Sequence, residues 1–224
     1  MLNTDMEMTT GKERERMNAD KTILHLCADI GSDSLPYKEA GYNVILIGSK
    51  IGVENYHPPE NVYGIIANPP CTMFSFARTN AKKPRDLREG MFLVKECLRI
   101  IWECQSRIIK DVQKYSPLKF WVLENPDAML RWFLGKPAMI YNPYDFGENY
   151  QKRTALWGIF NQPKKNPIDM TPEAKAKTNS QDLPKFDYMK SKDIASGYYG
   201  KLSRQDRRSI CSPKFSKAFF ESNP

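Results

Sequence analysis

A short apolar run that ends in two prolines places the tightest limit on how this chain can fold. Residues Val62–Ala67 are mostly β-branched, aromatic or small, which is typical of a buried strand. Pro69 and Pro70 must end that strand, because neither has a backbone N–H to donate and each fixes φ. Cys71 follows directly. The sequence therefore predicts a cysteine on a stiff turn at the carboxyl end of a strand, the edge at which open α/β sheets bind ligands.

The rest of the chain alternates between strand-like and helix-like segments. Further strands are expected at residues 22–27, 43–47, 120–123 and 155–160, and helices at 35–40, at 86–115 and after Ser212-Pro213. In the long helix apolar residues recur at three- and four-residue steps, so Cys97 and Cys104 are interpreted as packing residues. The last helix should bury Phe215 and Phe219. This alternation predicts an α/β fold with a mostly parallel, doubly wound sheet.

The length of 224 residues allows one sizeable core, so we expect a single domain over residues 21–224. A flexible polar tail should precede it at 1–20, and a loop-like insert poor in apolar residues should interrupt it at about 162–196. No apolar run is long enough to span a bilayer, and no signal peptide is recognisable at the N-terminus. Five scattered cysteines and two histidines form no metal-ligand spacing, so we expect reduced thiols in a cytoplasm and no metal site.

Polar residues follow two of the predicted strands and precede a third, in the order Cys71, Glu124 and Gln151-Lys152-Arg153. Such a set suits methylation of carbon 5 of cytosine. A thiolate adds to carbon 6 of the ring, an acid supports protonation of N3, and a cation steadies O2. Burial raises the pKa of a glutamate so that it can carry that proton, and nearby positive charge lowers the pKa of a cysteine.

These residues resemble motifs of the DNA cytosine-5 methyltransferase family, and specifically of its short, phage-like members. The matching segments are Asn68-Pro69-Pro70-Cys71, which Thr72-Met73-Phe74-Ser75 continues, Glu124-Asn125-Pro126, Gln151-Lys152-Arg153-Thr154, and Lys201 to Arg207 near the C-terminus. The resemblance implies Cys71 as the nucleophile, Glu124 as the partner of cytosine N3 and Arg153 as the cationic stabiliser. The implied substrate-binding residues are Asn68, Pro69, Pro70, Ser75, Asn125 and Gln151.

The resemblance also implies a Rossmann-like fold and S-adenosylmethionine as the methyl donor. The segment that matches the family's cofactor motif keeps one of its glycines, Gly31, and the end of the second strand offers Lys50 where the family has an acid. A carboxylate of Asp29, Asp33 or Glu54 would then have to compensate. The expected cofactor residues are Cys27, Ala28, Asp29, Ile30, Gly31, Ser32, Ser49, Lys50, Glu54 and Asn68.

The implied partner is DNA, double- or single-stranded, which also fits the net charge of +8, although a soluble protein can be basic without binding nucleic acid. The chain has no room for a full target-recognition domain, so a protein partner could supply recognition. Basic residues of the insert and the C-terminal segment could follow the phosphate backbone, and three tyrosines among them could stack on bases. These are Tyr188, Tyr198 and Tyr199.

Other interpretations of the same residues stay open. The chain could be a catalytically silent, methyltransferase-like protein that binds nucleic acid or a host protein. The chain could instead methylate an exocyclic amino group, which Asn68 and a proline carbonyl would bind. Cys71 then occupies the position of the aromatic residue that should stack on the base, and Glu124 would have no function in the reaction. Arg153 could simply pair with a surface acid, and His25 could be an ordinary polar residue.

Overall fold

The computed structural model describes residues 17–28, 30–78, 81–106, 118–168 and 208–224. Its strands are β1 (Thr22–Leu26), β2 (Asn43–Ile47), β3 (Val62–Ala67), β4 (Phe120–Pro126), β5 (Met139–Tyr141) and β6 (Thr154–Ile159). Its helices are α2 (Leu35–Glu39), α3 (Leu87–Gln105), α4 (Arg131–Leu134), the 3₁₀ helix η1 (Pro143–Phe146) and α7 (Pro213–Ser222). The five predicted strands are confirmed, whereas α4, β5 and η1 were not predicted.

The strands form one six-stranded sheet in the order β2-β1-β3-β4-β6-β5. β2, β1, β3 and β4 are parallel to one another, and β6 is antiparallel to both β4 and β5. The predicted α/β fold with a mostly parallel sheet is therefore confirmed, with two antiparallel pairs added at one side. Mixed sheets of this kind are common among large α/β sheets.

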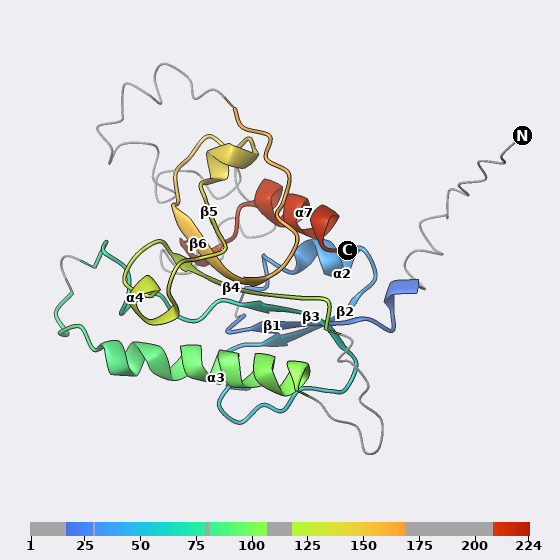
Figure 1. Cartoon of the computed structure of the whole chain (residues 1–224), viewed down its shortest axis with the longest axis horizontal. Coiled ribbons are helices and arrows are strands. Elements are labelled where there is room, and N and C mark those ends of the chain that lie inside the picture. The colour runs from blue at the N-terminus through green and yellow to red at the C-terminus, as the bar shows by residue number, and fades with distance from the viewer. Residues whose placement is uncertain (1–16, 29, 79–80, 107–117, 169–207) are drawn as a thin grey trace, which may run out of the picture.

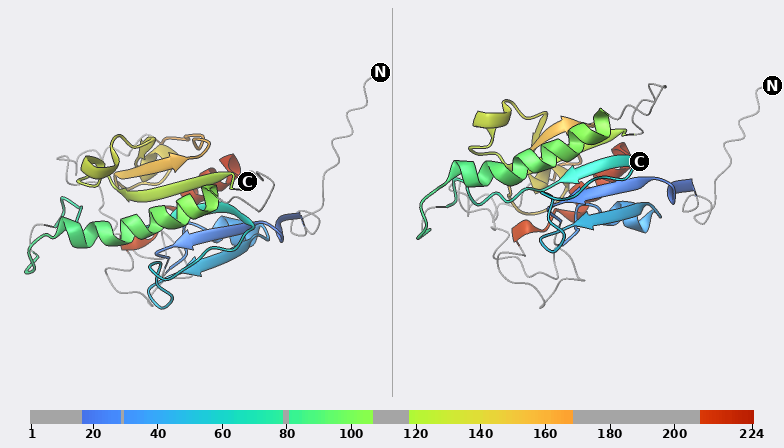
Figure 2. Two further views of the ribbon diagram at one scale, coloured as in Figure 1. Left: turned by 60° about the horizontal axis from the view of Figure 1, so that its bottom comes forward. Right: turned by 90° about the horizontal axis from the view of Figure 1, so that it is seen from below.

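Helices cover both faces of the sheet, as Figures 1 and 2 show: α3 lies on one face, and α2 and α7 lie on the other. Alternate residues of each strand point to opposite faces. In β1, for example, Leu24 and Leu26 join the core under α3, whereas Ile23 joins the core under α7. In β4, Leu123 faces α3 and Val122 faces α7. The polar residues at the carboxyl ends of the strands follow the same alternation.

The two longer helices begin at side-chain caps. Asp86 caps α3 by accepting a hydrogen bond from the Glu89 N–H, and Ser212 caps α7 by accepting one from the Phe215 N–H. The buried face of α3 includes Cys97 and Cys104, and that of α7 includes Phe215 and Phe219, as the sequence predicts. The predicted helix at 86–115 is confirmed as far as Gln105, and its remainder lies outside the described residues apart from Ser106, the C-cap.

Several predictions concern segments that the structure describes only in part or not at all. Most of the predicted N-terminal tail and most of the insert at 162–196 lie outside the described residues, as do Asp29 and the three tyrosines proposed to stack on bases. In the described part of the chain, no helix is both long and apolar enough to cross a membrane.

Candidate active site

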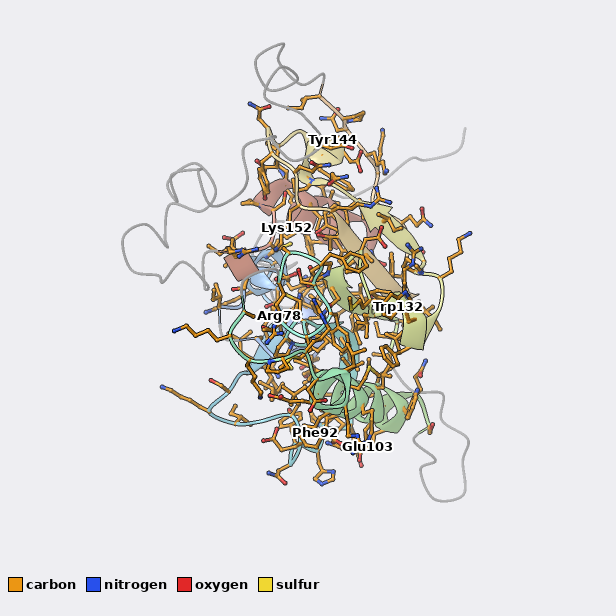
Figure 3. The ribbon with its side chains drawn as sticks, turned by 90° about the vertical axis from the view of Figure 1, so that its left-hand side faces the viewer. Arg78, Phe92, Glu103, Trp132, Tyr144 and Lys152 are labelled. Atoms are coloured by element: carbon orange, nitrogen blue, oxygen red, sulfur yellow. The ribbon has the colours of Figure 1, made fainter. Side chains whose placement is uncertain are left out.

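The candidate site lies at the carboxyl edge of the parallel strands, which Figure 3 shows from the side that carries Arg78 and Lys152. From β1 the chain adds β2 on one side and then β3 on the other, so the strand order reverses at β1. Ligands of open α/β sheets bind in the crevice at such a reversal. β1 leads into the turn after Leu26, β3 leads to Asn68, and β4 carries Glu124. The sheet therefore brings predicted site residues from the ends of three strands to one edge.

A row of hydrogen bonds runs across this edge on the face covered by α7. His25 Nε2 lies 2.8 Å from Asn68 Oδ1, and His25 Nδ1 lies 2.8 Å from Ser34 Oγ. Asn68 Nδ2 donates to Asp33 Oδ1 at 3.2 Å and to Glu124 Oε2 at 3.4 Å. Asn68 thus links β1 to β4 and fixes the position of the Glu124 carboxyl group.

The contacts of Asn68 also show that His25 Nε2 carries a proton. Because the Asn68 amide nitrogen faces two carboxyl groups, its oxygen must face His25 and accept, so the imidazole proton is on Nε2. Nδ1 lies 2.8 Å from the Ser34 hydroxyl, which is also 3.2 Å from the Gly31 carbonyl oxygen, an acceptor only. Burial lowers the pKa of His25, while Asp33 and Asn68 act in the opposite direction. His25 is therefore a buried, hydrogen-bonded residue beside Asn68, a position that the sequence did not predict. A polar residue inside an otherwise apolar strand was the available signal, since buried polar groups need partners.

Cys71 lies on a turn that several contacts hold in place. Its carbonyl oxygen accepts from the N–H groups of Phe74 and Ser75, each at 2.9 Å, so the chain curls into a helical turn after the thiol. Asn125, fully buried, donates from Nδ2 to the Pro69 carbonyl oxygen at 2.9 Å. The Arg85 guanidinium binds the carbonyl oxygens of Met73 and Ser75. Cys71 itself is exposed, as is Pro70, so a reagent can reach the thiol.

The N-terminal part of α3 packs closely against this turn. A Cβ atom at Gly90 would lie 2.7 Å from Met73 Cβ and 3.0 Å from the ring of Phe74. Real Cβ atoms do not approach other atoms that closely, so a side chain at residue 90 would displace the turn. Glycine at residue 90 therefore allows the Cys71 turn to pack this closely against α3.

The environment shifts the pKa of both predicted catalytic groups. Desolvation raises the pKa of Glu124, and the neighbouring Asp33 raises it further, while Lys152 and the Asn68 amide lower it. The surrounding protein atoms also raise the pKa of the Cys71 thiol, and so does the Glu124 carboxylate, whereas Lys152 and Arg208 lower it. A protonated Glu124 thus favours the thiolate of Cys71, because it removes a negative charge that opposes it.

Lys152, and not Arg153, is the cation of this segment that acts on both groups. Leu156 of β6 pairs with Glu124 and belongs to the core under α7. Lys152 has the same parity as Leu156, and its Nζ donates to the Ile210 carbonyl oxygen at 3.1 Å. Arg153 has the opposite parity, is exposed, and donates from Nε to Asp127 Oδ2 at 2.7 Å. The structure therefore places the predicted cationic stabiliser in a surface ion pair. Lys152 was missed because the register of β6 was unknown from sequence.

Three further predicted substrate residues are Pro69, Gln151 and Ser75. Pro69 is buried, and Gln151 is partly buried in a bridge just before β6. Ser75 is also partly buried, and its Oγ accepts from the Ala77 N–H at 3.2 Å.

The turn after β1 contains the predicted cofactor segment. Cys27 has a φ of 56° and Gly31 a φ of 73°, so the chain twice adopts the left-handed conformation here. Cys27 Sγ lies 3.8 Å from Cys97 Sγ, and the Ala28 N–H donates to the Ile47 carbonyl oxygen. Ile30 is partly buried, and Ser49, Lys50 and Glu54 are exposed beyond the end of β2.

Ser32, one of the predicted cofactor residues, joins this turn to the C-terminal segment. Its Oγ accepts from the Cys211 N–H at 3.0 Å and donates to Asp33 Oδ2 at 3.2 Å, and the residue is buried. It therefore attaches the C-terminal segment to the turn after β1. Cys211 is buried beside it, which explains its raised pKa.

A small cavity of about 20 Å³ lies between the sheet and α7, large enough for about one water molecule. It is lined by Asp33, Ile66, Val122, Glu124, Leu156, Cys211, Phe215, Ser216 and Phe219. Glu124 thus borders this small pocket on the α7 side. In the described residues no three or more His, Cys, Asp or Glu side chains are grouped as metal ligands.

Neither a scan against protein-family models nor a search of curated proteins finds a match to this chain. The arguments for its function therefore rest on the residues and geometry described above.

Proposed function

We propose that this protein transfers a methyl group from S-adenosylmethionine to carbon 5 of cytosine in DNA through a covalent Cys71 adduct. The observation that carries the proposal is an exposed thiol on a braced turn, within the electrostatic influence of Glu124 and Lys152. Glu124 is held by the Asn68 amide in an environment that raises its pKa. Nucleophile, acid and cation then meet at one sheet edge, as attack on a cytosine ring requires.

Each residue has a defined task in the proposed reaction. Glu124, when protonated, donates its proton to N3 as the Cys71 sulfur forms a bond to carbon 6. The displaced electron pair moves to carbon 5, which becomes nucleophilic. Lys152 stabilises the thiolate before attack and the developing negative charge on the ring afterwards. After carbon 5 has taken up the methyl group, loss of the carbon 5 proton to a base and breaking of the sulfur–carbon bond restore the aromatic ring and release the Cys71 thiolate, and N3 returns its proton to Glu124.

The methyl donor, when bound, would supply an electrophilic methyl group to carbon 5. The proposed fold is Rossmann-like, because four parallel strands reverse their order at β1 and helices cover both faces. Gly31, with its positive φ, allows the backbone of the β1 turn to approach a ligand closely. Glu54 is the exposed carboxylate beyond β2 that can accept hydrogen bonds from ribose hydroxyls, in place of the acid that Lys50 replaces. The residues of this turn therefore fit the donor.

The contacts of Asn68 and Pro69 disfavour methylation of an exocyclic amino group. That reaction needs the asparagine oxygen and a proline carbonyl to accept hydrogen bonds from the substrate. Here Asn68 Oδ1 accepts from His25, and the Pro69 carbonyl accepts from Asn125. With these acceptors engaged inside the protein, attack by the thiol is the better supported chemistry.

A catalytically silent binding protein is the second candidate. The raised pKa of Cys71 favours it, because the thiol of the free protein is then mostly protonated at neutral pH. Calorimetry distinguishes the two candidates. The enzyme should release or absorb heat on titration with S-adenosylmethionine, whereas a silent protein that has lost the cofactor site should not.

DNA that contains 5-fluorocytosine tests the chemistry directly, because fluorine at carbon 5 prevents loss of the proton and traps the adduct. In the presence of S-adenosylmethionine, wild-type protein should form a complex with this DNA that survives denaturation. Cys71→Ser should form none, and Cys104→Ser, which alters a buried thiol of α3, should behave as wild type. A denaturation-resistant complex in Cys71→Ser, or its absence in wild type, contradicts the proposal.

A further inference from the structure

An exposed pair of aromatic side chains on α4 lies next to the Cys71 turn. Trp132 is 63% exposed and Phe133 is 47% exposed. The edge of Phe133 packs on Phe74, with ring centroids 6.2 Å apart, and the Met129 N–H donates to the Phe74 carbonyl oxygen at 3.3 Å. Phe74 is part of the helical turn that Cys71 begins. The aromatic pair is therefore attached to the segment that carries the thiol.

Two guanidinium groups accompany these aromatic side chains. Asp127, almost fully buried, binds Arg131 through Oδ1 at 3.2 Å and Arg153 through Oδ2 at 2.7 Å. Both arginines remain largely exposed, at 43% and 58%. One carboxylate thus holds two cations in fixed positions, and the cluster keeps a net positive charge. Charged groups arranged in this way suit a phosphate backbone.

The aromatic and basic side chains lie on the same side of the molecule as the candidate site. In Figure 1, α4, which carries Trp132, lies at the left, the side that faces the viewer in Figure 3 and that includes the carboxyl edge of the parallel strands. Phe76, in the segment after Cys71, adds another aromatic side chain that is 57% exposed. Trp102 is nearly as exposed as Trp132, at 58%, but it lies near the C-terminal end of α3, which runs away from that edge.

We infer that Trp132, Arg131 and Arg153 form a platform for single-stranded DNA beside the Cys71 turn. This inference rests on the proposed function and specifies its substrate. Bases of a duplex are already stacked on their neighbours, whereas an unpaired base can stack on an exposed indole while arginines hold the adjacent phosphates. Nucleotides that flank the target cytosine stack on Trp132 and bring that cytosine to the thiol.

Binding of oligodeoxythymidylate tests the platform separately from the chemistry, because this strand contains no cytosine. Fluorescence anisotropy of a labelled strand should show that Trp132→Ala weakens binding by about five- to a hundredfold, as expected for loss of one stacked base. Trp132→Phe should restore most of the affinity, since a phenyl ring also stacks. Trp102→Ala is the matched control and should bind as wild type does. A duplex of the same length should bind more weakly than the single strand.

Three results would overturn the inference: unchanged affinity in Trp132→Ala, an equal loss in Trp102→Ala, or duplex binding as tight as that of the single strand. Thermal unfolding of each variant shows whether a loss of affinity reflects misfolding, and an exposed side chain predicts little change. The 5-fluorocytosine trap separates the two proposals. If the Cys71 adduct forms but Trp132 has no effect, only the platform is wrong. If Trp132 is required but no adduct forms, the platform stands and methyl transfer is wrong.

Discussion

The hydrogen bond from Asn125 to Pro69 should control the stability of the thiol-bearing turn. Asn125 is fully buried, and its Nδ2 donates to the Pro69 carbonyl oxygen at 2.9 Å. Its Oδ1 has no hydrogen-bond partner among the described residues. The hydrogen bond from Nδ2 is therefore the contact by which this buried side chain stabilises the turn. Replacing that donor in two ways, by Asn125→Ala and by Asn125→Asp, separates the effect of a lost bond from that of an added charge.

The two variants should differ in size of effect and in pH dependence. Asn125→Ala leaves the Pro69 carbonyl unsatisfied, which costs about 1–3 kcal/mol of unfolding free energy, and nothing at this position titrates. Asn125→Asp places an unpaired carboxylate against that carbonyl at neutral pH, which costs about 3–5 kcal/mol. When protonated, the new carboxyl group can donate to the carbonyl. Its folded pKa must therefore exceed its unfolded value of about 3.9, so the folded state binds the proton more tightly and stability falls as pH rises through the folded pKa.

Urea unfolding of wild type and both variants, repeated from mildly acidic to neutral pH, measures these differences. Each variant is compared with wild type at the same pH, so titration of other groups cancels. The deficit of Asn125→Ala should stay nearly constant, whereas that of Asn125→Asp should grow as pH rises and overtake it. An Asn125→Asp variant as stable as wild type at neutral pH, or parallel pH profiles for the two variants, would refute the assigned contact.

Three further predictions concern the site and the sheet. Glu124→Gln should abolish the trapped adduct yet raise the unfolding free energy at neutral pH. The pKa of Glu124 is raised in the folded protein, so wild type loses stability as pH rises above the ordinary carboxyl range. The gain should disappear in acid, where Glu124 is protonated in both the folded and the unfolded state. Lys152→Ala should slow adduct formation at saturating DNA by about a hundredfold, whereas Arg153→Ala should leave that rate near wild type. Gly158→Ala should cost about 3 kcal/mol or more in thermal unfolding, since its Cβ would lie 2.1 Å from the Trp121 carbonyl oxygen.

The sequence predicted those parts of the fold that local patterns determine. Apolar runs located the parallel strands, and two prolines correctly ended β3 before Cys71. The helix at the C-terminus was visible from Ser212-Pro213 and its aromatic residues. By contrast, β5 has three residues and α4 has four, too few to produce a clear period. These elements exist because the surrounding structure packs against them, as when Trp157 Nε1 donates to the Gly135 carbonyl oxygen just after α4.

The candidate site was predictable as a set of strand ends but not as a network. The sequence placed Cys71, Asn68 and Glu124 at one edge, and the structure joins Asn68 to Glu124 through a hydrogen bond. The sequence did not indicate that His25 of β1 lies beside Asn68, which follows the neighbouring strand β3. That contact depends on the register between β1 and β3, which pairs His25 with Ile66, two residues before Asn68. Register is a tertiary property, so the partner of a buried histidine cannot be deduced from its own strand.

The choice between Lys152 and Arg153 depends on register in the same way. Both residues belong to the segment that resembles a family motif, and each is one residue from the other, so they must point to opposite sides of an extended chain. The β4–β6 ladder pairs Glu124 with Leu156, which puts Lys152 on the face of Glu124 and Arg153 on the face of Asp127. A shift of one residue in that ladder would exchange the two cations. Motif spacing alone therefore could not show which cation lies on the face of Glu124, whereas the pairing of two antiparallel strands does. Arg153 lies instead with Arg131 and Trp132 on the exposed surface proposed to hold DNA.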